Sequence, residues 1–200
     1  MNKETLEKIF QAAKKVFAEK GFSGARIDDI ADKAGLNKAM IYYHYKSKED
    51  LYKAVLDNFF QKVEYENPSL EHLNSWDRLN ACIEIFSKKL EMDRLERFSI
   101  ITRELVSCGD TFKEIRDKYW IPEYVFFHDI ITNGVAKGEF STKEKIDFIV
   151  FTIFSHLVYY KISQVTYDNS TIYDSLYPEN NREKILEYLK KLLKFLLNVK

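Results

Sequence analysis

Residues 27–48 of this 200-residue chain read IDDIADKAGLNKAMIYYHYKSK. Apolar residues at positions 27, 30, 31 and 34 follow the spacing of one helical face, and Gly35 can take the left-handed conformation that ends a helix. Two residues later, Asn37 is a suitable N-cap for a second short helix over residues 38–45. The stretch therefore predicts a helix, a tight turn and a second helix.

The flanking segments predict further helices. Apolar spacing predicts a helix over residues 5–20 that Gly21 ends, and Ser47 is a suitable N-cap for a helix that continues to about residue 65. Beyond Pro68, the same spacing predicts helices over residues 75–92, 95–107, 111–137 with an interruption at Pro122, 142–164 and 181–197. Three prolines and six glycines are too few for the many tight turns of a β protein, so we expect an all-α fold.

The composition excludes several classes of protein. Apolar residues at 46% and charged residues at 31% are typical of a globular chain and not of a disordered one. Cys82 and Cys108 have neither the spacing of zinc ligands nor that of a disulfide framework. The N-terminus lacks the pattern of a signal sequence, and the apolar run Ile146–Tyr160 is too short for a membrane span. We expect a cytoplasmic protein without a membrane partner.

The second short helix carries the chemistry of a DNA-reading element, although the net charge of the whole chain is zero. Amide and ammonium groups at its start can reach base edges, small apolar residues can contact thymine methyl groups, and three consecutive aromatic residues offer polar tips. Lys48, which follows Ser47, and Arg26, which precedes the helix that begins at residue 27, can reach phosphates. The candidate DNA-binding residues are Arg26, Asn37, Lys38, Ala39, Met40, Tyr42, Tyr43, His44 and Lys48.

The first sixty residues resemble the TetR/AcrR family of bacterial transcriptional regulators. The resemblance rests on Ala12-Ala13 with Phe17, Lys20-Gly21-Phe22, Ile30-Ala31, Ala34-Gly35-Leu36, Ile41-Tyr42-Tyr43-His44-Tyr45 and Ser47-Lys48-Glu49-Asp50-Leu51. It implies phosphate contacts by Tyr42, His44 and Lys48, and groove contacts by the other six candidates. The chain departs from the family pattern at Ala25-Arg26, Ala39-Met40 and Tyr45. The first two departures imply a different operator sequence.

We expect two domains: a helix-turn-helix head over residues 1–46, with the motif at about 25–44 and a linking helix over 47–65, and a C-terminal helical bundle over 66–200. The last two predicted helices carry more apolar surface than one small domain hides, so a second copy of the chain would cover the excess in a four-helix interface. The candidate interface residues are Phe151, Phe154, Leu189, Leu193 and Leu196.

The aromatic residues of the C-terminal region favour a small-molecule cavity between helices, as the resemblance also implies. Its candidate lining is Trp120, Tyr124, Phe127, His156 and Tyr160, which suits a small apolar or aromatic effector. The predicted function is that of a homodimeric repressor that binds a near-palindromic operator and is released by this effector. We expect no catalytic residue, metal or cofactor.

Two other functions remain open on the sequence alone. Neutral net charge would suit a helical interaction or sensor module whose head binds protein instead of DNA. A small helical enzyme could use a cavity carboxylate such as Glu104 or Asp129, although the chain has no P-loop, dinucleotide fingerprint or nucleophile elbow.

Overall fold

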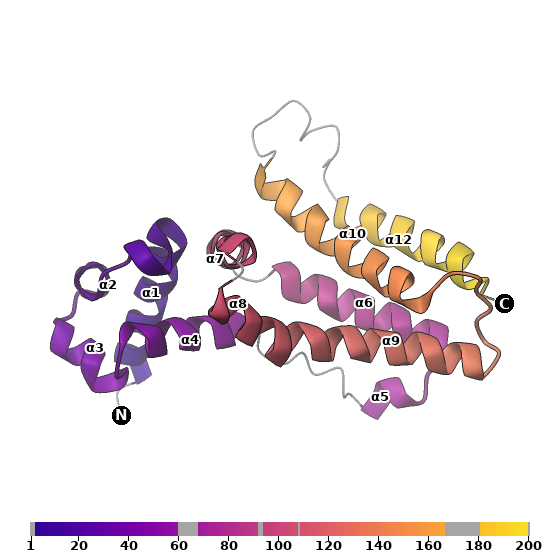
Figure 1. Ribbon diagram of the computed structural model, residues 1–200, viewed down its shortest axis with the longest axis horizontal. Helices are drawn as coiled ribbons and strands as arrows, with labels where there is room; N and C mark the ends of the chain where they lie inside the picture. Colours follow the sequence, from indigo (N-terminus) through magenta and orange to yellow (C-terminus); the bar gives the residue numbers. More distant parts are fainter. Residues whose placement is uncertain (1–2, 60–67, 92–93, 108, 167–180, 200) are drawn as a thin grey trace. The chain divides into compact units, whose positions relative to one another are not determined.

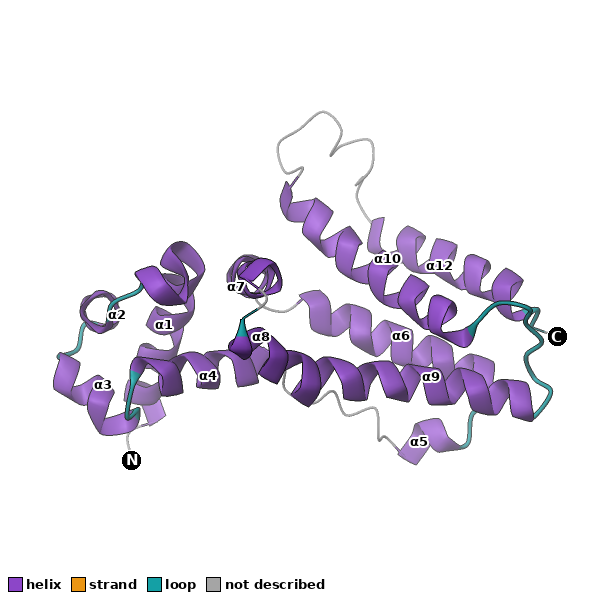
Figure 2. Cartoon of the chain, in the orientation of Figure 1, coloured by secondary structure: helices purple, strands orange, loops and turns teal. Residues whose placement is uncertain are grey.

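The computed structural model describes residues 3–59, 68–91, 94–107, 109–166 and 181–199, and no strand occurs in these ranges (Figures 1 and 2). The prediction of an all-α protein is confirmed. Residues 60–65 of the predicted linking helix and Cys108 lie outside the described residues. The chain divides into two compact units, residues 1–62 with 93–117 and residues 63–92 with 118–200.

The first unit contains the predicted helix-turn-helix. Its helices are α1 (Lys3–Gly24), α2 (Ile27–Ala34), α3 (Lys38–His44), α4 (Lys48–Phe59), α7 (Arg94–Ser107) and α8 (Asp110–Ile115). One apolar stripe from each of the first four helices forms a core that includes the fully buried Ile9, Phe17, Ile30, Ile41 and Leu51. The stripes are those that the helical spacing of the sequence predicts.

Three residues set the ends of these helices. Gly21 has a φ of 69°, so the regular part of α1 ends there as predicted. Gly35 has a φ of 66°, and its N–H group and that of Leu36 donate to the last carbonyls of α2. At the start of α4, Ser47 Oγ accepts a hydrogen bond of 3.1 Å from Asp50 N.

Helix α7 packs against α1 and therefore belongs to the first unit, although the sequence predicts residues 93–117 as part of the C-terminal bundle. Its Phe98 and Ile100 are buried, and the Arg103 guanidinium donates a hydrogen bond of 3.2 Å to the carbonyl of Glu19 near the end of α1. Helical periodicity identifies the apolar face of a segment but not the helix that covers it, which is why the sequence did not predict this pairing.

The second unit is a bundle of α5 (Pro68–Glu71), α6 (Ser75–Glu91), α9 (Ile121–Ala136), α10 (Ile146–Thr166) and α12 (Asn181–Leu197). Helix α10 packs against α6, α9 and α12, which explains why its sequence has almost no polar face. Within the described residues it is the one helix long and apolar enough to cross a membrane, and its three helical neighbours are those of a core helix.

Polar contacts also join the bundle helices. The Lys190 ammonium of α12 lies 2.6 Å from a carboxylate oxygen of Glu84 on α6, and Arg182 Nε donates to Ser87 Oγ at 3.2 Å. Lys161 of α10, whose side chain is almost fully buried, donates to Glu91 at the end of α6. A buried ammonium without such a partner would be strongly destabilising, so this pair helps to specify how α10 meets α6.

Two predicted helix boundaries differ from the structure. The predicted helix over residues 111–137 consists of α8, a π-helical turn η1 (Arg116–Trp120) and α9. Pro122 lies in the first turn of α9 and lacks the N–H that would pair with the carbonyl four residues earlier, so the distortion precedes the proline. Helix α10 begins at Ile146 instead of residue 142, because Thr142 Oγ1 accepts from Glu144 N in a turn before the helix.

Candidate nucleic-acid interface and ligand pocket

Helix α3 turns one residue inward and most others outward. Ile41 is fully buried in the core, whereas Tyr43 is 80% exposed, Tyr42 46% and Met40 37%. Ala39 is exposed as well. Apolar side chains that gather on one exposed surface are typical of a contact surface.

The start of α3 holds two of the predicted base-reading residues in defined positions. Asn37 Oδ1 accepts a hydrogen bond of 2.8 Å from Met40 N, which caps the helix and leaves the Asn37 side-chain NH₂ group as its donor. The Lys38 ammonium lies 3.0 Å from each carboxylate oxygen of Asp28 on α2. The hydrogen bond to Asp28 raises the pKa of Lys38. The sequence did not predict a role for Asp28, because a pairing across the turn has no periodic signal.

Lys48 has a role that the sequence did not predict. Its ammonium donates to the carbonyls of Phe22 at 2.8 Å and Ala25 at 3.1 Å, and it lies 4.4 Å from the centre of the Phe22 ring. These contacts tie the start of α4 to the segment that joins α1 to α2. An ammonium has three N–H donors, so one donor remains for the predicted phosphate contact.

Arg26 and His44 lie at the borders of α2 and α3. The Arg26 side chain is exposed, while its backbone N–H donates to Asp29 Oδ2 at 3.2 Å. The Lys20 ammonium, 2.9 Å from the same oxygen, holds the pKa of Asp29 below its ordinary value. The His44 ring meets the Tyr43 ring edge to face at 5.0 Å. The nine predicted DNA-binding residues thus comprise the N-caps of α2 and α3, six residues of α3 and Lys48 at the start of α4.

Three of the predicted ligand-lining residues are not among those that line the cavity at His156. Phe127 is fully buried and packs edge to face against Phe86 and Phe154, at centroid distances of 6.2 and 5.4 Å, so it belongs to the core. Tyr124 donates a hydrogen bond of 2.7 Å to Asp147 Oδ1, and burial together with this contact raises the pKa of Tyr124 to about 12. Trp120 lies in η1.

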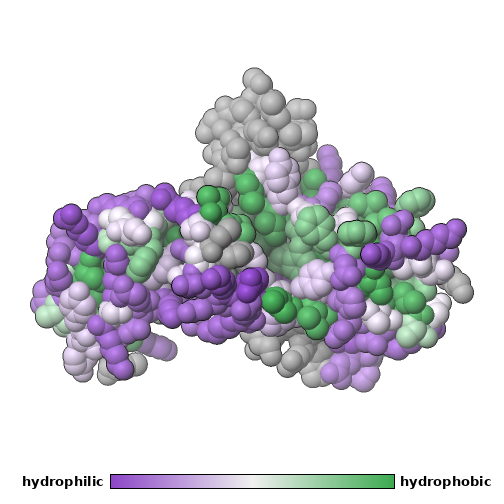
Figure 3. Space-filling model, in the orientation of Figure 1, coloured by the Kyte–Doolittle hydropathy of each residue, from purple (hydrophilic) through white to green (hydrophobic). Residues whose placement is uncertain are grey.

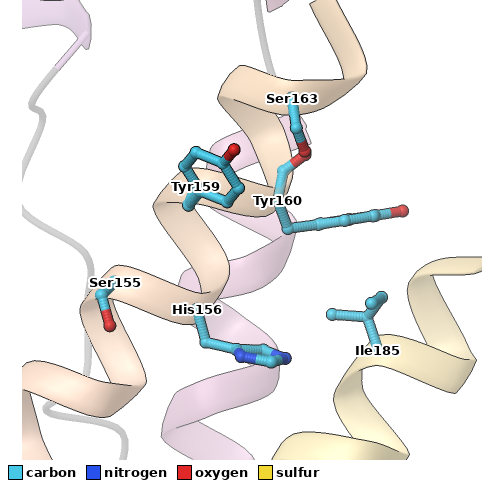
Figure 4. A pocket seen from close by; sticks show the side chains of 6 residues that line it. All are labelled: Ser155, His156, Tyr159, Tyr160, Ser163 and Ile185. Carbon is cyan, nitrogen blue, oxygen red and sulfur yellow. The ribbon is translucent and has the colours of Figure 1, made fainter. Parts of the chain in front are cut away.

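The other two predicted residues, His156 and Tyr160, line a cavity of about 430 Å³ between α10 and α12. Figure 4 shows both side chains pointing from α10 towards Ile185 on α12. The complete lining is Ser155, His156, Tyr159, Tyr160, Ser163 and Ile185. The sequence did not predict the serines, Tyr159 and Ile185 as lining residues, since small and aliphatic residues at helical spacing are also typical of an ordinary helix interface.

His156 supplies the one orphaned polar atom of this cavity. Its Nε2 is buried without a hydrogen-bond partner among the described residues, and its ring stacks on Tyr188 of α12 at 5.7 Å. Burial lowers the pKa of His156 below its ordinary value of 6.5, so the imidazole is neutral at pH 7. A neutral imidazole nitrogen pairs with one hydrogen-bonding group of a ligand.

The predicted dimer residues divide into core and surface. Leu189 and Leu193 are fully buried inside their own bundle, so they are not available to a second copy. Phe154 and Leu196 are half-buried, and Phe151 is 66% exposed. The large hydrophobic side chains that α10 and α12 do expose are Phe148, Phe151, Tyr159, Tyr188 and Phe195, which we call the aromatic face. Figure 3 shows hydrophobic side chains reaching the surface of this unit.

Neither carboxylate of the alternative enzyme hypothesis is among the residues that line this cavity. Glu104 accepts a hydrogen bond of 2.6 Å from the Tyr52 hydroxyl in the first unit. Asp129 is exposed on α9. Among the residues that the structure describes, no group of three His, Cys, Asp or Glu side chains could hold a metal ion.

Comparison with known proteins gives consistent matches. Residues 9–55 match the model of bacterial regulatory proteins of the tetR family. The HTH-type transcriptional regulator SrpR of Pseudomonas putida is 27% identical over 146 residues. These residues cover 68% of this chain and 63% of SrpR, so the match spans slightly less than two thirds of that relative. A probable HTH-type transcriptional regulator of Bacillus subtilis, YttP, is 28% identical over 155 residues, 75% of this chain and 74% of YttP. The structure of a Clostridium perfringens putative fatty acid metabolism regulator matches with a TM-score of 0.74 and 22% identity, over 96% of this chain and 97% of that one.

Proposed function

This chain belongs to the TetR family of bacterial regulatory proteins, and from this premise we propose that it represses transcription as a homodimer bound to a near-palindromic operator. The observation that carries the proposal is the outward face of α3, where Met40, Tyr42 and Tyr43 are exposed around the buried Ile41. A recognition helix needs this combination of a single inward anchor and an exposed first turn.

In the proposed complex, α3 lies in the major groove. Arg26, Asn37, Lys38, Ala39, Met40 and Tyr43 face the groove, and Tyr42, His44 and Lys48 contact phosphates. The capping hydrogen bond from Met40 N engages the Asn37 oxygen and leaves both NH₂ donors, so Asn37 suits a base acceptor such as guanine O6 or thymine O4. Two heads related by a two-fold axis would meet grooves about 34 Å apart, which gives the operator its inverted repeat.

The proposed dimer forms through the aromatic face of α10 and α12. Five large side chains there are each more than 60% exposed, which is costly in a monomer. Pairing this face with its two-fold mate would bury all ten rings. This proposal replaces Leu189 and Leu193, which already pack inside one chain, with Phe148, Tyr159, Tyr188 and Phe195 as the interface residues.

The proposed effector site is the cavity at His156. A small apolar or aromatic molecule would lie against Tyr160 and Ile185 and satisfy His156 Nε2 with one hydrogen-bonding group. The ligand would be uncharged at the atom that meets the imidazole, because burial disfavours an ion pair there. The proposal needs no cofactor and no catalytic residue, and it assigns the protein to the cytoplasm.

In the proposed regulation, α7 transmits the effect of the bound ligand to the DNA-binding head. In the sequence this helix lies between two segments of the ligand-binding bundle, but it packs on α1 of the DNA-binding head. A ligand that favours one arrangement of the bundle would release the operator only to the extent that it binds the two arrangements with different affinities.

The test is selection of bound duplexes from a random pool by the purified protein. We expect an inverted repeat, bound more weakly as salt rises, because phosphate contacts release counterions. No preference for any inverted repeat at low ionic strength would contradict the proposal. Salt-independent binding of a protein partner would instead favour the interaction-module hypothesis.

A further inference from the structure

We infer that Asp28 and Lys38 read one G·C base pair as a unit, and that Asp28 is the residue that makes this contact specific. The inference rests on the proposed binding of DNA by α3. It assigns a recognition role to α2, the helix before the recognition helix. Asp28 lies in the first turn of α2 and Lys38 is the first residue of α3, so the turn at Gly35 brings them together.

The geometry of the pair supplies a donor and an acceptor side by side. The Lys38 ammonium lies 3.0 Å from both Asp28 oxygens, and both side chains remain largely exposed, at 48% for Lys38 and 63% for Asp28. The ammonium has three N–H donors and meets two oxygens, so at least one donor stays available. Each carboxylate oxygen also keeps acceptor capacity.

This arrangement complements the major-groove edge of a G·C pair. Guanine presents the acceptors O6 and N7, which lysine contacts, and cytosine presents the N4 amino donor, which aspartate accepts. An A·T pair presents these groups in a different order, with the adenine N6 donor between the acceptors adenine N7 and thymine O4, whereas G·C places two adjacent acceptors before the cytosine donor. The pair therefore favours G·C when the lysine meets the two guanine acceptors and the carboxylate meets the cytosine amino group beyond them.

Charge argues against a phosphate contact for Lys38. The carboxylate would be repelled by the phosphate backbone, and an ion pair of zero net charge contributes little to counterion release. The head has a net charge of only +2 over residues 1–60, from 11 basic and 9 acidic residues, so it binds non-specific DNA weakly. A pair of zero net charge that contacts bases increases selectivity without increasing the affinity for non-specific DNA.

Asp29, the neighbour of Asp28, does not share this role. It accepts from Arg26 N and pairs with Lys20 at 2.9 Å, so it belongs to the start of α2. Asp32 is exposed on the same helix, and among the described residues no ion pair involves it. Asp32→Asn is therefore a matched control for Asp28→Asn, since both remove one negative charge from α2.

The experiment compares wild type, Asp28→Asn, Lys38→Met and Asp32→Asn in selections from the same random pool, with salt titrations on the selected duplex. In Asp28→Asn and Lys38→Met we expect preference for G·C at one position of each half-site to fall on the order of tenfold. Asp28→Asn should also steepen the logarithmic salt dependence by about one, because the released Lys38 reaches a phosphate. Asp32→Asn should keep the wild-type preference.

Two results would overturn the inference. One is a uniform gain in affinity for Asp28→Asn with base preferences unchanged at every position. The other is a loss of preference in Asp32→Asn equal to that in Asp28→Asn, which would assign the effect to net charge. Failure of the wild-type protein to select any inverted repeat would count against the proposed function itself. Circular dichroism melts would show that each variant is folded.

Discussion

The Tyr52 hydroxyl on α4 donates a hydrogen bond of 2.6 Å to Glu104 Oε1 on α7, across 52 residues of chain. Tyr52 is only 4% exposed, and its ring packs against Phe17 and Phe22 at 4.8 and 4.9 Å. Burial and the hydrogen bond to Glu104 raise the pKa of Tyr52 far above its ordinary range, so the hydroxyl keeps its proton and remains a donor. Helix α4, which precedes the bundle in the sequence, and helix α7, which lies between bundle helices in the sequence, are thus joined within the first unit.

Replacing Tyr52 with Phe should weaken this joint without emptying the core. We expect a loss of about 1–2 kcal/mol in the free energy of unfolding, because a charged acceptor loses its buried donor. We also expect a smaller effect of the effector on operator affinity, since α7 and α4 would move more independently. Glu104→Gln keeps an acceptor oxygen and is the control; denaturant unfolding and operator titrations measure both effects. Equal behaviour of Tyr52→Phe and wild type would show that the hydrogen bond contributes to neither.

Lys48→Ala should have two separable effects. Loss of the ammonium leaves the carbonyls of Phe22 and Ala25 without their donor, and we expect the head to lose about 1–3 kcal/mol of stability. The logarithmic salt dependence of operator binding should fall by about one, with all sequences affected alike. Calorimetry and salt titrations measure the two effects. A changed base preference, or an unchanged salt dependence in a folded variant, would remove Lys48 from phosphate contact.

The head was predictable from sequence because its signals are local. Gly21, Gly35, Asn37 and Ser47 each end or begin a helix through groups within four residues, and all four act as predicted. Ile41 is in the core because helical spacing aligns it with the stripe of α2. Local capping chemistry depends little on the remainder of the fold, so these predictions needed no tertiary information.

Predictions about which residues face a neighbouring helix, a cavity or a second copy need more than local signals. Leu189 and Leu193 share an apolar stripe with the surface residues of α12, and only the position of α10 and α6 shows which of them point inward. Phe127 looked suitable for a cavity because it is aromatic, but Phe86 and Phe154 fill the space around it. Periodicity gives the direction of a side chain relative to its own helix and leaves its neighbours undetermined.

His156 should make the stability of the protein depend on pH. Its pKa is lowered in the folded state, so the unfolded chain takes up a proton first as the pH falls through 6.5, and stability decreases in that range. The decrease ends below the lowered folded pKa. His156→Phe should reduce the loss of stability between about pH 7.5 and pH 5.5. Denaturant unfolding at both pH values measures this, and an unreduced loss in His156→Phe would assign the pH dependence to other groups.

Substitutions in the aromatic face should distinguish loss of dimerisation from loss of folding. Phe195 is 82% exposed, so Phe195→Glu places a charge in water in the monomer but in a desolvated interface in the dimer. Together with Phe151→Glu it should convert the dimer into a folded monomer, as sedimentation velocity would report, and weaken operator binding because the two heads are no longer linked. Leu193→Glu should instead unfold the bundle, since Leu193 is fully buried within one chain.

The control for the charge itself is Val106→Glu on α7. Val106 is 81% exposed, almost the same as Phe195, but it lies in the first unit and outside the aromatic face. This variant should sediment as wild type does. An intact dimer in the double variant would move the interface to another surface, whereas a monomeric Val106→Glu would place α7 at the contact between copies. Because all three variants are compared in the same measurement, the sedimentation profile alone distinguishes the aromatic face from the core leucines and from a non-specific effect of charge.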